Sequence, residues 1–193
     1  MRALQKITAT LLLLCLPMAQ AAANLIPSPP RLAASGHVLL DFHSGQVISE
    51  TNASEQMEPA SLTKMMTAYA VFHELKAGNI QLQDKVRVSE KAWRMTGSRM
   101  FIEVNTFVTV EELLKGLIIQ SGNDASVALA EHVAGSEEAF VGLMNNHAAR
   151  LGLSGTRFHN STGLPAEGHL STCLLYTSPS PRDRTRSRMP SSA

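Results

Sequence analysis

The chain has 193 residues, of which 44% are hydrophobic and 17% are charged. These proportions predict a packed core and exclude a wholly disordered protein. The chain has only two cysteines, and no closely spaced Cys or His pairs. We therefore expect neither a disulfide framework nor a zinc site.

The N-terminus has the pattern of a secretory signal. Two basic residues precede an apolar run over residues 7–16, and the sequence Ala-Gln-Ala follows at residues 19–21. We expect residues 1–21 to be removed after export, since the run is too short to span a bilayer comfortably. A lipoprotein signal ending at Cys15 is the alternative, and the bulky leucine before this cysteine argues against it. The proline-rich residues 22–34 are expected to form an extended leader.

The C-terminus also differs from the middle of the chain. Ser, Pro and Arg dominate residues 173–193, which show neither helical nor strand periodicity. A solvated basic tail is one interpretation. We favour another, because the segment resembles the translation of a transposase sequencing adapter and would then be an artefact. Without residues 1–21 and 173–193, 11 Lys and Arg remain against 15 Asp and Glu, a net charge of −4 that argues against a nucleic-acid partner.

The first predicted elements are a β-hairpin and a long helix. Residues 37–41 and 46–50 have strand character, and residues 43–45 (His-Ser-Gly) supply the turn between them. Apolar residues then recur at helical spacing, which predicts a helix over residues 59–77. Gly78 provides its C-terminal end.

Weaker strand signals and three further helices follow. Residues 86–108 show mixed signals, and residues 160–168 are expected to form a loop because they are rich in turn residues. The predicted helices cover residues 110–119, 125–134 and 137–150, and they begin at the expected capping residues Thr109, Asp124 and Ser136.

A strand hairpin followed by helices predicts an α+β fold whose sheet is completed by later strands. The sequence shows no such strands, and a two-stranded hairpin alone is only marginally stable. We therefore expect residues 35–172 to form part of a domain, truncated before its last strands.

Ser61 and Lys64 are candidates for a reactive pair. Residues three apart on a helix share one face, and free N–H groups at the helix start favour negative charge developing near Ser61. A serine hydroxyl attacks efficiently only when a base takes its proton, and a buried lysine with a lowered pKa can act as that base. The Ser-x-x-Lys spacing alone is common and more often marks a capped helix with a solvated lysine.

A second polar cluster, Ser-Gly-Asn at residues 121–123, lies between two predicted helices. Ser121 could relay a proton between Lys64 and a leaving group. Asn123 could bind a substrate amide through both ends of its carboxamide. Taken alone, the cluster is more often a polar turn between helices.

Together these motifs resemble the first and second active-site motifs of the serine D-Ala-D-Ala carboxypeptidases of the peptidase S11 family, the low-molecular-mass penicillin-binding proteins. The resemblance covers residues 35–172. It implies a β-lactamase/transpeptidase-like fold, in which helices flank an antiparallel sheet. The segments that carry it are residues 59–66 (PASLTKMM), 120–125 (QSGNDA), 134–145 (AGSEEAFVGLMN) and 160–165 (NSTGLP).

The resemblance also implies a role for each candidate residue. Ser61 would be the acylated nucleophile and Lys64 its general base, with Ser121 as proton relay. Asn123 would bind the peptide amide of the substrate or the side chain of a penicillin. The implied partners are the peptidoglycan stem peptide and β-lactam antibiotics, without metal or other cofactor. The implied location is the periplasm, or the outer face of the cytoplasmic membrane, of a bacterium.

The family's third motif, Lys-Thr-Gly, has no counterpart here, because Ser161 and not a lysine precedes Thr162 and Gly163. The strand that carries this motif would supply an oxyanion-hole donor, and loss of one donor costs about a hundred- to a thousandfold in rate. The family's C-terminal β domain and its membrane-anchoring amphipathic helix are not found either. We therefore expect the sequence as given to turn over little or no substrate.

Three other functions remain open at this point. A serine β-lactamase shares Ser-x-x-Lys, but class A members resemble Ser-Asp-Asn where this chain has Gly122, and they use a downstream glutamate. A peptidoglycan DD-endopeptidase of the same fold is not separated by these motifs. A non-catalytic penicillin- or wall-binding protein would keep the fold but release no D-alanine.

Overall fold

The computed structural model describes residues 32–41 and 43–173. The chain divides into two compact units, residues 1–33 and 34–193, and every element named below belongs to the second. The expected signal at residues 1–21 lies outside the described residues. So does all of the expected artefact beyond Cys173, and both therefore stay predictions.

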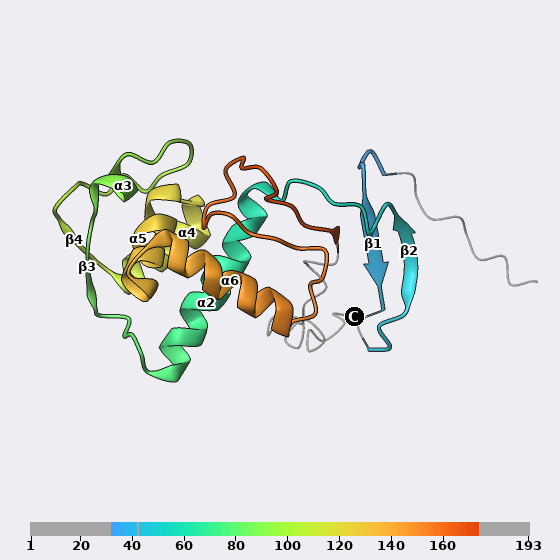
Figure 1. The fold of residues 1–193 in the computed structure, drawn as a ribbon, viewed down its shortest axis with the longest axis horizontal. Helices are drawn as coiled ribbons and strands as arrows, with labels where there is room; N and C mark the ends of the chain where they lie inside the picture. Colours follow the sequence, from blue (N-terminus) through green and yellow to red (C-terminus); the bar gives the residue numbers. More distant parts are fainter. Residues whose placement is uncertain (1–31, 42, 174–193) are drawn as a thin grey trace, which may run out of the picture. The chain divides into compact units, whose positions relative to one another are not determined.

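The predicted hairpin is present at the start of the second unit. Strands β1 (His37–Leu40) and β2 (Val47–Thr51) pair antiparallel, with a shift in register after Leu39 (Figure 1). Gly45 in the connecting turn has a φ of 70°, a conformation that glycine adopts without steric cost. The prediction of a two-stranded hairpin is therefore confirmed.

The long helix also forms where its periodicity predicts it. A short 3-10 turn, η1 (Ala60–Leu62), leads into helix α2 (Thr63–Ala77). Gly78 ends the helix in the left-handed region, with a φ of 77°. The predicted bounds hold, except that the first turn, which carries Ser61, is 3-10 and not α-helical.

Residues 85–109 contain a second pair of strands and a short helix. Strand β3 (Lys85–Arg87) pairs antiparallel with β4 (Phe107–Thr109), and helix α3 (Glu90–Trp93) lies between them in the sequence. Within the described residues the two strand pairs remain separate sheets. The combination of helices and antiparallel strands confirms the predicted α+β class.

Three helices complete the described part: α4 (Val110–Gln120), α5 (Asn123–Ala134) and α6 (Glu137–Arg150). The predicted capping box at the start of α4 is present. The Thr109 hydroxyl accepts a hydrogen bond from the Glu112 N–H, and the Glu112 carboxylate accepts one from the Thr109 N–H. None of the helices in residues 32–41 and 43–173 is both long and apolar enough to cross a membrane.

The predicted start of α5 is wrong. Asp124 does not cap a helix beginning at the next residue, since α5 already begins at Asn123. The Asp124 carboxylate is buried and accepts hydrogen bonds from the backbone N–H groups of Met100, Phe101 and Ile102, at 3.0, 2.8 and 3.3 Å. The side chain therefore holds a distant loop, a role that its position in the sequence did not indicate.

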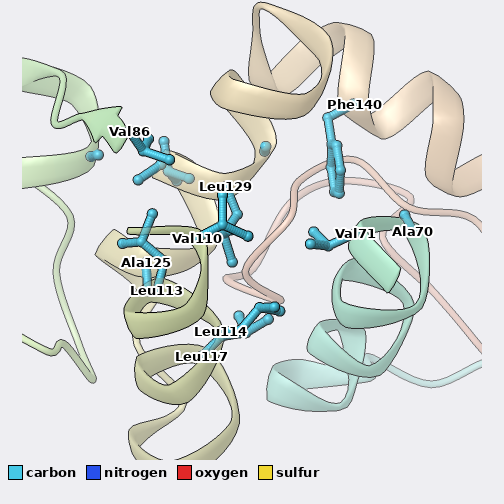
Figure 2. Close-up of a cluster of buried hydrophobic side chains, with 14 of the residues drawn as sticks. Ala70, Val71, Val86, Val110, Leu113, Leu114, Leu117, Ala125, Leu129 and Phe140 are labelled. Atoms are coloured by element: carbon cyan, nitrogen blue, oxygen red, sulfur yellow. The ribbon is translucent and has the colours of Figure 1, made fainter. Parts of the chain in front are cut away.

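Helix α5 lies at the centre of the core. It packs against α2, α3, α4, α6 and β3, and every residue of its first eight is buried. Small side chains such as Ala125 let the neighbouring helices approach closely. Figure 2 shows Leu129 of α5 near Val110 and Leu113, with Val71 of α2 and Phe140 of α6 in the same cluster. This packing holds the first turns of α2 and α5, which carry Lys64 and Asn123.

Replacing Thr109 by Ala removes the capping box of α4, because one orphan N–H group loses its acceptor. We expect the free energy of unfolding to fall by about 1 kcal/mol. Urea denaturation followed by circular dichroism measures this. The control is Thr96→Ala, since the hydroxyl of Thr96 makes no hydrogen bond within the described residues; an equal loss in both variants would contradict the capping role.

Candidate active site

Ser61 lies on an exposed and unusual turn of the backbone. The residue before it, Ala60, has a φ of 47°, which is uncommon for any residue other than glycine. Such a conformation costs about 1–3 kcal/mol and persists only where the surrounding structure imposes it. The Ser61 side chain is therefore presented to solvent by a locally strained 3-10 turn.

Lys64 lies one turn further along and is buried, with 6% of its surface exposed. Its ammonium donates a hydrogen bond to the Thr162 carbonyl at 2.7 Å and lies 3.4 Å from the Ser61 hydroxyl oxygen. Burial disfavours the charged form and lowers the pKa of Lys64 to about 8. About a tenth of the lysine is then neutral at pH 7, and only this form can accept a proton. The pair therefore has the chemistry of a nucleophile and its base.

The acceptor for Lys64 belongs to a loop that Asn160 organises. The Asn160 side-chain oxygen accepts hydrogen bonds from the N–H groups of Thr162 and Gly163, and its amide nitrogen donates to the Leu164 carbonyl. An asparagine that binds nearby backbone in this way fixes a tight turn. The turn directs the Thr162 carbonyl toward Lys64.

Ser161 anchors the same loop to three helices. Its N–H and hydroxyl both donate to Glu137 of α6, at 2.9 and 2.8 Å. Its carbonyl accepts from the hydroxyls of Thr67 in α2 and Ser126 in α5, at 2.7 and 2.6 Å. All of these groups are buried, so each needs its partner. Lys91 completes the network by pairing with Glu137 at 2.9 Å.

His169 makes a second connection between the segment 159–169 and α2. Its Nδ1 accepts the N–H of His159 at 3.0 Å, so its Nε2 carries the proton and donates to the Thr63 hydroxyl at 2.7 Å. Burial lowers the pKa of His169 and favours this neutral form. Thr63 directly precedes Lys64, and the contact therefore helps to hold Lys64 in position.

Asn123 is buried near the start of α5, with 4% of its surface exposed. Its side-chain nitrogen donates to the Thr96 carbonyl at 2.6 Å, and its backbone N–H donates to the Ser98 carbonyl at 2.7 Å. Its side-chain oxygen has no hydrogen-bond partner among the described residues, which leaves an oriented acceptor.

Ser121 ends α4 in the left-handed region, with a φ of 54°. The side chain is half-buried. Within residues 32–41 and 43–173 its hydroxyl makes no hydrogen bond, so none joins it to Ser61 or Lys64. Its role as a proton relay therefore stays a prediction.

The site depends on residues that the sequence reasoning did not single out. Thr162 contributes a backbone carbonyl, which every residue has, so no side-chain pattern could identify it. Glu137 and His169 act through contacts with residues far away in the sequence. A possible signal was the Asn160 turn, because asparagine followed by small polar residues and glycine favours a structured turn. Among the described residues, the single group of side chains suited to a metal ion lies elsewhere, on α2 and α6.

Replacing Gly163 by Ala should disturb the site, since an added Cβ would overlap the Ala60 carbonyl and lie 3.0 Å from the Ser61 nitrogen. The φ of 84° adds strain for any residue with a Cβ. We expect the free energy of unfolding to fall by more than about 2 kcal/mol. Denaturation measures this, with Gly142→Ala as control, because a Cβ there meets nothing within 4 Å and helix α6 should gain slightly. Equal stability of the two variants would contradict the close packing at Gly163.

Comparison with known proteins matches the chain to one family. The sequence pattern of peptidase S11, described as D-alanyl-D-alanine carboxypeptidase, matches residues 23–178. D-alanyl-D-alanine carboxypeptidase DacC of Escherichia coli is 47% identical over 167 residues, which is 83% of this chain and 42% of the relative. A D-alanyl-D-alanine endopeptidase of Haemophilus influenzae is 34% identical over 137 residues, 70% of this chain and 46% of the relative.

Solved structures support the same assignment and the predicted fold. Penicillin-binding protein 5 from Haemophilus influenzae superposes with a TM-score of 0.74 at 41% identity, covering 77% of this chain and 44% of that one. The chain thus spans less than half of the length of each of these three relatives. It belongs to the peptidase S11 family of D-alanyl-D-alanine carboxypeptidases.

Proposed function

We propose that the protein containing this chain is a serine D-Ala-D-Ala carboxypeptidase that removes the terminal D-alanine from peptidoglycan stem peptides. The observation that carries the proposal is the buried Lys64, whose ammonium lies 3.4 Å from the exposed Ser61 hydroxyl. Membership of the peptidase S11 family gives this pair its reaction class.

In the proposed reaction, neutral Lys64 takes the proton of Ser61 as its oxygen attacks the carbonyl between two D-alanines. The bond to the terminal D-alanine breaks, and the proton passes to its leaving amine, with Ser121 as relay. An ester then joins Ser61 to the shortened peptide. Water hydrolyses this ester, again with removal of a proton by the base, and restores the serine. A β-lactam would acylate Ser61 in the same way and leave slowly.

Asn123 is proposed to orient the substrate. Thr96 already holds its side-chain nitrogen, so the free side-chain oxygen can accept the N–H of a substrate peptide bond. Because this oxygen is buried and fixed in direction, it favours a substrate whose amide N–H can donate a hydrogen bond to it. A substrate without such an N–H would leave the oxygen unpaired and bind less well. The role in binding penicillin follows from the same geometry.

The proposed location is outside the cytoplasm, because the stem peptide is part of the cell wall. The signal-like pattern at residues 1–21 supports export, and the family match begins just after it, at residue 23. Attachment to the outer face of the cytoplasmic membrane would require a segment of the family that this chain does not match. The chain as given should show little turnover, since it contains no counterpart of the third motif.

Replacing Ser61 by Ala should abolish covalent labelling of the full-length gene product by a fluorescent penicillin, because the acylated oxygen is lost. Gel fluorescence after denaturation measures this directly. Ser54→Ala is the control, since Ser54 is also exposed but has no side-chain hydrogen bond within the described residues. Persistent labelling of the Ser61 variant would show that another residue is the nucleophile.

The pH dependence of acylation tests the role of Lys64. Its pKa is lowered to about 8, so the neutral base is lost as the pH falls below that value. We expect the second-order rate of penicillin acylation to fall about tenfold per pH unit below 8 and to level off above it. Lys64→Arg should react about a hundred- to ten-thousandfold more slowly, because arginine stays charged. A rate that does not change between pH 6 and 9 would contradict this assignment.

A DD-endopeptidase activity is a second candidate, favoured by the similarity to the Haemophilus influenzae endopeptidase. Both activities would use the same serine and base, and they differ in the bond that is cleaved. Incubation of the full-length gene product with purified cross-linked muropeptides separates them. Released free D-alanine supports the carboxypeptidase, and cleaved cross-links without free D-alanine support the endopeptidase.

A further inference from the structure

Two histidines and a glutamate meet where α2 packs against α6, away from the proposed active site. His73 and Glu74 belong to α2, and His147 belongs to α6. Each side chain offers one ligand-type atom, and the three atoms all lie within 4.8 Å of one another. Figure 1 shows the two helices that bring them together. We propose that these three residues bind a zinc ion that links the C-terminal ends of α2 and α6.

The distances in this cluster suit a tetrahedral ion. Zinc binds imidazole nitrogen and carboxylate oxygen at about 2.0–2.2 Å, so two ligand atoms on one ion lie about 3.3 Å apart. The Nδ1 of His73 and the Oε1 of Glu74 are 3.4 Å apart. The His73 ring is half-exposed and lies 4.8 Å from the His147 ring, centroid to centroid. A small rotation of the exposed ring can therefore close the remaining gap, with water as fourth ligand.

His147 is the second observation that points to a ligand. It is 2% exposed, its Nε2 is buried, and neither ring nitrogen has a hydrogen-bond partner among the described residues. A buried imidazole nitrogen without a partner is costly, and a metal ion would satisfy it. The Tyr69 ring packs edge-on against the imidazole at 5.2 Å and holds its orientation. Burial lowers the pKa of His147.

The carboxylate of Glu74 is also held in position to bind a metal ion. Asn79 donates a hydrogen bond to Oε2 at 2.6 Å, and this leaves Oε1 directed toward His73. Such an outer contact fixes a carboxylate in many metal sites. It also lowers the pKa of Glu74, so the group stays ionised.

The charges around the cluster are of both signs. Arg150, one turn from His147, and Lys76, in the last turn of α2, repel a cation. The Glu74 carboxylate opposes this repulsion, and both α2 and α6 end close by, where the helix dipole is negative. Two imidazoles with one carboxylate favour zinc over calcium or magnesium, which prefer oxygen ligands. His73 is nine residues from Lys64, about 14 Å along the helix, so the ion would hold helices together and take no part in acylation.

Isothermal titration of the full-length gene product with zinc chloride tests the proposal. We expect one zinc ion per chain and a higher thermal unfolding midpoint when zinc is present. Magnesium chloride should produce neither effect. A midpoint that zinc leaves unchanged would overturn the proposal.

His73→Gln is the decisive variant, because this exposed side chain is not part of the core. We expect it to weaken zinc binding at least tenfold and to leave the metal-free unfolding midpoint unchanged. The matched control is His159→Gln, another exposed histidine, which should bind zinc as the parent does. Equal zinc affinity of the His73 variant and the parent would show that the cluster is not the site.

Discussion

The hydrogen bond from Lys64 to the Thr162 carbonyl is the contact on which the candidate site depends. It joins residues 98 positions apart and removes an ammonium group from water. The same burial that costs stability lowers the pKa of the lysine and makes it a usable base. In the proposed mechanism the reactivity of Ser61 therefore depends on the packing of the loop that contains Thr162, since a solvated lysine at the same spacing would keep its ordinary pKa.

The other polar contacts of the loop support the hydrogen bond between Lys64 and Thr162. Ser161 and Asn160 fix the loop that carries the acceptor, while His169 holds the residue next to Lys64. Ser126 joins the loop to the central helix α5. Ser161, Ser126 and His169 are buried, so loss of one partner leaves the other unsatisfied, and the network keeps a single arrangement.

Local signals in the sequence were sufficient for the regular elements. The helix ending at Gly78, the hairpin and the capping box at Thr109 were predicted because short-range chemistry determines them. Ser61 and Lys64 could be identified because they lie three residues apart in one predicted helix. The roles of Asp124, Glu137 and the Thr162 carbonyl could not be identified. Their partners are distant in the sequence, and a backbone carbonyl has no residue-specific signature. The sequence likewise did not point to His73 and His147 as metal ligands, because they are far apart in the sequence and only the packing of two helices brings them together.

The long separation between Lys64 and Thr162 has a consequence for the order of folding. Contacts between distant residues form late, because closing a long loop costs entropy before the contact can repay it. Helix α2 can form before residues 160–169 have docked. Lys64 is then hydrated and fully protonated, and cannot act as a base. In the proposed mechanism Ser61 therefore becomes reactive only when residues 160–169 have docked, which would link the onset of acylation to the completion of the fold.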